Sequence, residues 1–239
     1  MRSQTLSLKV QGRGLVRRGR TLGEIRYSQP LEFTGALCKQ WRTDAITILL
    51  EHIWQGYDLF QKEILIDTTQ PEENVERSIT QLLEPRIQKF MDADAPFYLQ
   101  HSPGEDATRQ PAPASPPIYD LGFVLHSNER SIFPIEAKVL PSDRAVAEYV
   151  NEVKENYLTC RYAPFSKEAV MLGYLLKGKA TIALDRIAEK LTCQMHDFPP
   201  LPTRSHKFSE HIRLHSDCLL SSRDFRCHHL ILPIMPSKP

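Results

Sequence analysis

The chain has 239 residues, of which 41% are hydrophobic and 25% are charged, with a formal net charge of +1. These values are typical of a folded globular chain that buries a substantial core, and they exclude a small fold that depends on disulfide or metal staples. No stretch reaches the roughly 20 apolar residues that span a bilayer, and no apolar run follows the N-terminus as in a secretory signal. We therefore expect no membrane partner and a cytoplasmic location.

Charge and cysteine are unevenly placed along the chain. Residues 1–26 are strongly basic and contain one acid, Glu24. Such a stretch attracts phosphate backbones, and it is equally compatible with a solvated tail. The cysteines are odd in number and scattered, which favours reduced thiols over a disulfide framework. We divide the chain into a basic and helical region, 1–70, and a second domain, 71–239.

Two helices are predicted in the first part of the chain, over 43–64 and 72–92, because apolar residues recur there at helical spacing. Acids suit the start of a helix, and the second helix has three near its start: Glu72, Glu73 and Glu76. We expect Pro85 to kink or divide this helix.

Strands and helices then alternate. Residues 101–117 are rich in Pro, Ala and Ser and predict a loop. The predicted strands are 97–100, 118–126, 131–139, 169–176, 208–215 and 228–234, and the further predicted helices are 143–159 and 179–192. This order predicts an α/β fold with a mixed central sheet flanked by helices.

The two strands 118–126 and 131–139 form a predicted hairpin whose turn we centre on Asn128. This register aligns the apolar side chains on one face: Tyr119, Leu121, Phe123, Leu125, Phe133, Ile135 and Ala137. It also places Asp120 directly opposite Glu136, with Lys138 two residues further along the same face. Two carboxylates and an ammonium group are thus expected to converge on the face opposite the core.

Paired carboxylates repel each other unless a cation lies between them, and Mg²⁺ binds such groups together with water and phosphate oxygens. A metal held there polarises a phosphoryl oxygen and activates water, while a lysine orients that water. Mn²⁺ is an expected substitute. The alternative is a solvated hairpin face in which the same three residues form a cross-strand salt bridge.

A family resemblance rests on these residues. The matching pieces are Tyr119-Asp120 and Phe133-Pro134-Ile135-Glu136-Ala137-Lys138. They resemble the D…(D/E)-x-K signature of the PD-(D/E)XK phosphodiesterase superfamily, which has a restriction-endonuclease-like fold. The resemblance implies the core order helix, three strands, helix, strand over about 72–177. Two departures are that no proline directly precedes Asp120, and that Pro134 lies within a strand, where we expect an edge position or a bulge.

The helix before the hairpin extends the resemblance. Residues 76–83 are similar to the E-x-x-I-T-x-x-L helix opening of several such nucleases, which implies that Glu76 is a third metal ligand or a base, with Glu73 in reserve. Helix-capping electrostatics is the alternative explanation.

Further pieces resemble small stand-alone bacterial nucleases, several of them associated with anti-phage defence: Glu148-Tyr149-Val150, Arg161-Tyr162-Ala163, Met171-Leu172-Gly173-Tyr174 and His228-His229-Leu230. This implies a nucleic-acid substrate, DNA in the first place, and a partner protein of a defence system. An oligomer is left open.

Other functions are weighed against this one. Gly-rich phosphate loops with Lys-Ser/Thr and Gly-x-Ser-x-Gly motifs are both absent, so the sequence supports neither an NTPase nor a serine hydrolase. Cys193-x-x-His196 and the run from His211 to Cys218 have spacings that suit zinc, although ordinary core or surface histidines explain them equally. A non-catalytic nucleic-acid-binding or assembly subunit is the alternative from another class. The sequence predicts a Mg²⁺-dependent nuclease whose catalytic residues are Asp120, Glu136, Lys138 and Glu76.

Overall fold

The computed structural model describes residues 41, 43–104, 116–164, 166–213 and 223–236. They form the α/β fold that the element order predicts, with a mixed seven-stranded sheet in the order β1-β2-β3-β4-β7-β6-β5. The strands are β1 Phe97–His101, β2 Leu121–Leu125, β3 Asn128–Leu140, β4 Glu168–Leu175, β5 Met195–Asp197, β6 His206–Ile212 and β7 Asp224–Pro233. The strands β3, β4 and β7 are parallel to one another, and the other neighbouring pairs are antiparallel.

Helices cover the sheet. They are α3 Thr43–Glu63, α4 Glu72–Gln88, α5 Ala147–Glu152, the π-helical η1 Val153–Tyr157 that continues α5, and α6 Ala180–Leu191. The prediction that Pro85 divides the second helix is wrong, because α4 runs through this residue to Gln88. Pro85 lies in the last turn, so the hydrogen bond that its missing N–H would donate to the carbonyl oxygen of Gln81 is lost near the end of the helix. From α4 to β4 the order is helix, three strands, helix, strand.

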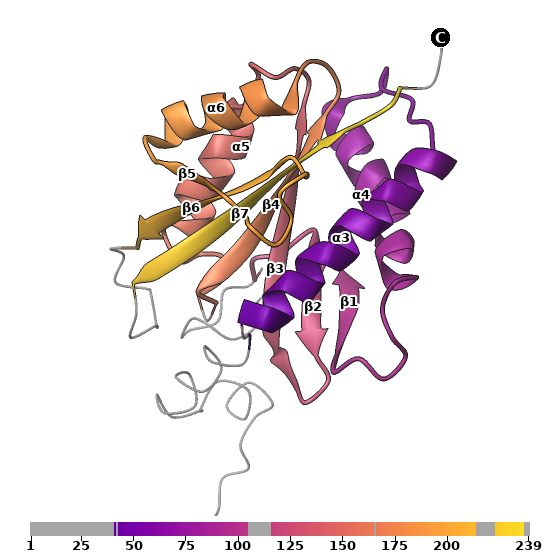
Figure 1. Ribbon diagram of the computed structural model, residues 1–239, viewed down its shortest axis with the longest axis vertical. Coiled ribbons are helices and arrows are strands. Elements are labelled where there is room, and N and C mark those ends of the chain that lie inside the picture. Colours follow the sequence, from indigo (N-terminus) through magenta and orange to yellow (C-terminus); the bar gives the residue numbers. More distant parts are fainter. Residues whose placement is uncertain (1–40, 42, 105–115, 165, 214–222, 237–239) are drawn as a thin grey trace, which may run out of the picture.

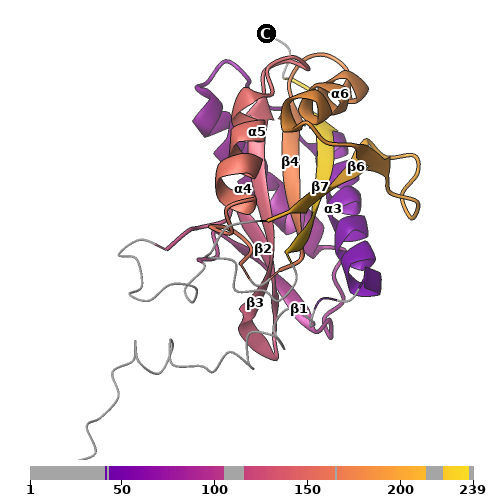
Figure 2. The same cartoon turned by 90° about the vertical axis from the view of Figure 1, so that its left-hand side faces the viewer.

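The sheet separates two hydrophobic layers. The first contains the inward faces of α3 and α4, and the second contains those of α5, η1 and α6. Figure 1 shows α3 lying across the face turned to the viewer, and Figure 2 shows α3 and α5 on opposite sides of the sheet. Because α3 shares its layer with strands of the sheet, the residues on both sides of position 70 belong to one core.

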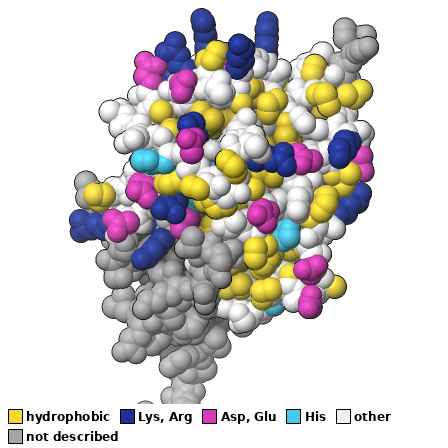
Figure 3. Space-filling view, in the orientation of Figure 1, with side chains coloured by type: hydrophobic (Ala, Val, Ile, Leu, Met, Phe, Trp, Pro, Cys, Tyr) yellow, Lys and Arg dark blue, Asp and Glu magenta, His cyan; other side chains and the backbone are white. Residues whose placement is uncertain are grey.

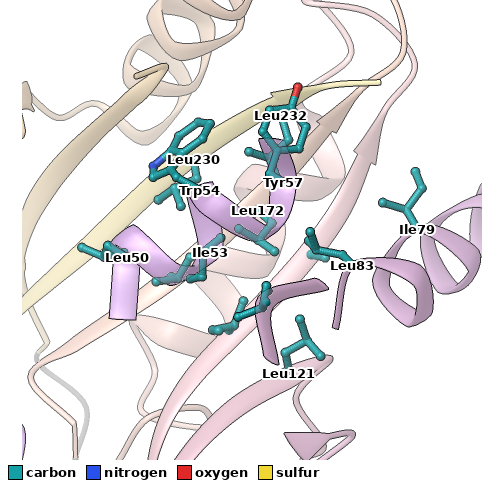
Figure 4. Packing of buried hydrophobic residues seen from close by; sticks show 14 of the residues in the cluster. Leu50, Ile53, Trp54, Tyr57, Ile79, Leu83, Leu121, Leu172, Leu230 and Leu232 are labelled. Atoms are coloured by element: carbon teal, nitrogen blue, oxygen red, sulfur yellow. The ribbon is translucent and has the colours of Figure 1, made fainter. Parts of the chain in front are cut away.

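Side chains of β4 enter both layers, which explains its near-continuous apolar sequence. Val170, Leu172 and Tyr174 belong to the first layer, and Ala169 and Met171 to the second. Figure 4 shows how Leu172 meets side chains of α3 and β7 in the first layer, while Ile79 and Leu83 of α4 close its side.

The predicted hairpin register is confirmed over most of β2. Leu121 pairs with Ile135 and Phe123 with Phe133, as the apolar pattern indicates. The predicted turn centre is wrong, because Asn128 already belongs to β3 and pairs with Leu125. An irregularity between Val124 and Leu125 absorbs the difference.

The placement of Tyr119 on the first layer is also wrong. Strand β2 begins only at Leu121, and Asp120 forms a bend, so the alternation of side chains does not extend back to Tyr119. Tyr119 packs in the second layer, on the opposite face from Leu121.

Pro134 causes no bulge in β3. It pairs with Gly122, and the irregularity of this ladder lies elsewhere. The backbone nitrogen of Pro134 is directed away from β2, towards β4, whose pairing with β3 starts only at Ile135. A missing N–H therefore costs no ladder hydrogen bond at this position.

Two expectations about the chain's environment can be compared with the described residues. None of their helices is long and apolar enough to cross a membrane. Cys193 and Cys227 are free thiols, whereas Cys160 is disulfide-bonded, so the expectation of reduced thiols is wrong for Cys160.

Candidate active site

The candidate site lies where β3 extends beyond its neighbour β2. The pairing of β2 with β3 ends at Leu121 and Ile135, so the next N–H groups on this edge have no strand to bind within the described sheet. Two carboxylates accept these N–H groups in place of a neighbouring strand. Asp120 Oδ2 accepts the N–H of Ala137 at 2.8 Å, and Glu76 Oε2 accepts the N–H of Val139 at 3.1 Å. The site therefore assembles from α4, the bend before β2, and the exposed edge of β3.

Lys138 connects the carboxylates. Its Nζ donates to Glu76 Oε1 at 3.2 Å, to Glu136 Oε1 at 3.3 Å and to the carbonyl oxygen of Ala137 at 2.7 Å. Burial opposes the charge, but Glu136, Glu76 and Asp120 together raise the pKa of Lys138. The lysine is therefore a protonated cation held by three oxygen atoms.

Glu136 is the most enclosed member of the site. Only 5% of the residue is exposed, and its Oε2 is buried without a hydrogen-bond partner within the described part of the chain. Burial, and next the charge of Asp120, raise its pKa well above the ordinary value, while Lys138 opposes this shift. The alternative interpretation of this region as a solvated hairpin face is therefore wrong for Glu136.

Glu76 is the helix residue that reaches the hairpin, as the resemblance implies, and Glu73 is exposed on the outer side of α4. Burial raises the pKa of Glu76, Lys138 lowers it, and Asp120 raises it again. The electrostatic link to Asp120 shows that all three carboxylates belong to one cluster. The expectation that these groups lie on a face opposite the core is wrong, because both faces of the sheet are covered by hydrophobic layers.

Two residues near this cluster were given no role at the site by the sequence. Glu152, on α5, raises the pKa values of both Glu136 and Lys138. Tyr162 donates a hydrogen bond to the carbonyl oxygen of Ile118 at 3.3 Å, and burial, then Glu136 and Glu152, raise its pKa. Glu152 stands three residues after the buried Tyr149, so helical spacing places it on the inward face. Tyr162 belongs to the resembling piece Arg161-Tyr162-Ala163, but the sequence indicates no role for it at the site.

The backbone that carries Asp120 is held from both sides. The Tyr119 hydroxyl accepts the N–H of Ala163 at 2.9 Å, and the N–H of Ser102 donates to the carbonyl oxygen of Asp120 at 3.0 Å. Ser102 and Ala163 both have φ of +52°, a left-handed conformation that non-glycine residues adopt at a cost. Such conformations are common where a site must be held in place.

The donor set fits a hard divalent cation. Its oxygens come from carboxylates and a carbonyl group, which are the ligands that Mg²⁺ and Mn²⁺ prefer. The orphaned Glu136 Oε2 is an additional acceptor. The described residues hold no ready-made group of three or more His, Cys, Asp or Glu side chains for a metal, and at this site Lys138 lies among the carboxylates.

Zinc has no ready-made site either within the described residues. Cys193 is half-buried and the His196 ring stacks on Phe208. His211 lies 2.7 Å from the Ser209 hydroxyl through its Nε2. The expected partners His215 and Cys218 lie outside the described residues.

Most of the histidines of β6 and β7 belong to buried networks. His229 lies between the hydroxyls of Tyr149 and Ser209, at 2.9 and 2.8 Å. His228 lies 3.1 Å from His206 and 2.8 Å from a carboxylate oxygen of Glu168. These histidines explain the His-rich sequence as core structure, and Tyr149 is a core residue as well.

A hollow of about 460 Å³ lies beside the N-terminal ends of strands β4 and β7. It is lined by Lys167, Glu168, Glu210, His211, Ile212, Asp224, Phe225 and Arg226. Arg226 already forms ion pairs with Glu210 at 2.8 Å and Glu168 at 3.8 Å. Because these charges are paired with each other, we place the candidate site at the carboxylate cluster on β3.

No family model matches the chain, and neither the curated proteins nor the solved structures contain a match to it.

Proposed function

We propose that the chain is a Mg²⁺-dependent phosphodiesterase that cleaves DNA, with Asp120, Glu136 and Glu76 as metal ligands and Lys138 as an assisting group. The observation that carries this proposal is the buried Glu136, whose Oε2 has no partner within the described residues. Burying a carboxylate costs several kcal/mol, and carboxylates whose pKa is raised by burial and a like charge cluster at functional sites.

The chain's own residues have distinct roles in this proposal. Asp120 and Glu76 each anchor one oxygen on the edge of β3 and are only partly buried, so substrate and solvent reach them. Lys138 is also partly exposed and carries a positive charge that stabilises charge developing on phosphate oxygens. When bound, Mg²⁺ supplies polarisation of the phosphoryl oxygen and acidifies water.

DNA as the substrate, and a role in anti-phage defence with a partner protein, rest on the resemblance of the motifs. The structure adds two exposed cations next in sequence to site residues, Arg77 and Arg161. Figure 3 shows that the α3 face mixes both signs of charge among its described side chains, with Lys and Arg gathered along the upper edge. We therefore propose that side chains around the site contact the phosphates, rather than side chains in the middle of the α3 face. A cytoplasmic location stays a prediction.

A divalent-ion titration of cleavage tests the proposal. Plasmid, linear duplex, single-stranded DNA and RNA are incubated with the full chain in Mg²⁺, Mn²⁺ or chelator. We expect metal-dependent cleavage of DNA and a loss of roughly 100-fold or more in D120N and E136Q, with DNA binding retained. E148Q, at an exposed position of α5, is the matched control and keeps its activity.

A different result favours the non-catalytic alternative. If the wild-type chain binds DNA and cleaves none of the substrates with either ion, the chain is a nucleic-acid-binding or assembly subunit rather than an enzyme.

A further inference from the structure

The environment of Lys138 resembles that of a metal ion. An ammonium group has three N–H donors, and all three are used here, by two carboxylate oxygens and one carbonyl oxygen. These are the hard oxygen ligands that Mg²⁺ and Mn²⁺ bind. The lysine therefore lies where the donor set would place a divalent cation.

We propose that Lys138 is an internal counter-ion that competes with the divalent cation, so that metal binding requires its ammonium group to leave Glu76 and Glu136. This inference rests on the proposed metal site and adds how its affinity is set. It also orders the events, because Lys138 becomes free to contact a phosphate only after the metal has displaced it.

Sterics and charge both require this exclusion. A magnesium ion bonds to oxygen at about 2.1 Å. An ion that bound the Oε1 atoms of both glutamates would enter the space of Nζ, which lies 3.2 and 3.3 Å from the same two atoms. Two cations this close repel strongly in a partly buried site. The two groups cannot share these oxygens.

The buried Oε2 atom of Glu136 is a further possible ligand for the metal. It is an acceptor that Lys138 does not use, and it has no partner within the described residues. Glu136 could therefore offer this oxygen to a divalent cation, while its Oε1 would become available only when Lys138 leaves it. A neutral residue at position 138 leaves both oxygens free from the start.

Calorimetric titration with Mn²⁺, without nucleic acid, tests the competition. We expect Lys138→Met to bind Mn²⁺ about tenfold more tightly than the wild type or better, and Glu136→Gln to lose most binding. Arg144→Gln is the matched control, because it removes an exposed positive charge that lies outside the hydrogen bonds of Lys138 with Glu76, Glu136 and Ala137. It leaves the affinity of the wild type nearly unchanged.

Thermal unfolding covers the case in which Lys138→Met folds poorly in chelator, since it leaves three carboxylates with no cation. Binding to the native state raises the melting temperature, so Mn²⁺ stabilises this variant more than the wild type. Lys138→Gln is also neutral at this position, so we expect Mn²⁺ to raise its melting temperature more than that of the wild type as well.

Outcomes for this inference and for the proposed function are distinguishable when cleavage is measured in parallel. If Lys138→Met binds Mn²⁺ no more tightly than the wild type while the wild type cleaves DNA, the competition is overturned and the nuclease stands. If Lys138→Met binds more tightly and the wild type cleaves nothing, the competition stands and the nuclease is overturned. If neither protein binds Mn²⁺, the competition is overturned, and metal-dependent cleavage decides the function separately.

Discussion

The folded state disfavours the charged form of Glu136. Its folded pKa lies above the ordinary value of a glutamate, so its ionisation at pH 7 lowers the free energy of unfolding. We expect E136Q to abolish cleavage and to raise the free energy of unfolding by about 1 kcal/mol, as is common when a functional charge is removed. Urea denaturation at pH 7 measures this, with E148Q as an exposed control that stays within about 0.5 kcal/mol. A clear loss of stability in E136Q would show that the fold needs this charge.

The buried histidines make stability depend on pH. Burial, and next the charges of His211 and His228, lower the pKa of His229 to about 3. As pH decreases, His229 binds a proton in the unfolded state, where its pKa is about 6.5, before it does so in the folded state. Its contribution to the free energy of unfolding is therefore complete above about pH 6.5 and decreases below this value. The contribution lost is about 1.4 kcal/mol per pH unit for this one residue.

The variant His229→Gln isolates the contribution of this histidine. The raised pKa values of Glu76 and Glu136 also make stability depend on pH, but they are present in both the wild type and the variant. We expect the variant to be less stable at pH 7.5, because His229 bonds two hydroxyl groups. Its deficit should shrink by about 1.4 kcal/mol at pH 5.5. Urea titrations at the two pH values measure the change, and an equal deficit at both would contradict a neutral buried His229.

At the residue scale, strand alternation was sufficient to predict that Asp120, Glu136 and Lys138 come together. It failed for Tyr119, because alternation holds only inside a strand and β2 begins only at Leu121. Helical spacing places Glu152 on the inward face of α5, but its effect on Glu136 depends on how α5 packs on β3. The contact of Tyr162 likewise depends on the packing of the loop after the helices.

Among the elements, α3 and α4 meet at a close contact that only glycine allows. A Cβ at Gly56 would lie 2.7 Å from the backbone nitrogen of Ile87 and 2.8 Å from its Cα. Alanine gains about 1 kcal/mol of helix propensity over glycine, while overpacking against backbone costs about 1–3 kcal/mol or more. We expect G56A to lower the free energy of unfolding by about 1–2 kcal/mol. Gln55→Ala, exposed on the same helix, is the control for propensity, and a stabilised G56A would show that the helices separate easily.

Length explains which elements the sequence predicts well. The long periodic helices α3, α4 and α6 and the apolar strand β4 lie within a few residues of their predicted bounds. The three-residue β5 has too few residues for a pattern and was missed. The predicted helix 143–159 is one α-helical and one π-helical segment, because apolar spacing does not distinguish these hydrogen-bond patterns.

For the whole molecule, β4 joins the two hydrophobic layers, since Leu172 lies in the first and Met171 in the second, both with 0% exposure. We expect Leu172→Ala and Met171→Ala each to lower the free energy of unfolding by about 2–5 kcal/mol. Both should shift one common transition, because both layers pack on the same strand. Far-UV circular dichroism and tyrosine or tryptophan fluorescence measure it, and two separate transitions would contradict a shared core.

The sheet order is the feature that the sequence predicted least. The last strand of the described residues, β7, lies between β4 and β6 in the interior of the sheet rather than at an edge. This position buries the adjacent His228 and His229 on opposite faces of one strand, where each joins a different network. Local patterns indicate a strand there but contain no information on its neighbours, which depend on long-range pairing.

A crystal structure of the chain with Mn²⁺, located by its anomalous scattering, tests the shared-cation claim most directly. We expect one ion within about 2.0–2.3 Å of a Glu136 oxygen, with Asp120 or Glu76 completing the protein ligands and Lys138 Nζ moved away from both glutamates. A crystal saturated with Mn²⁺ that shows no ion at β3, with Lys138 still bonded to Glu76 and Glu136, would contradict the account.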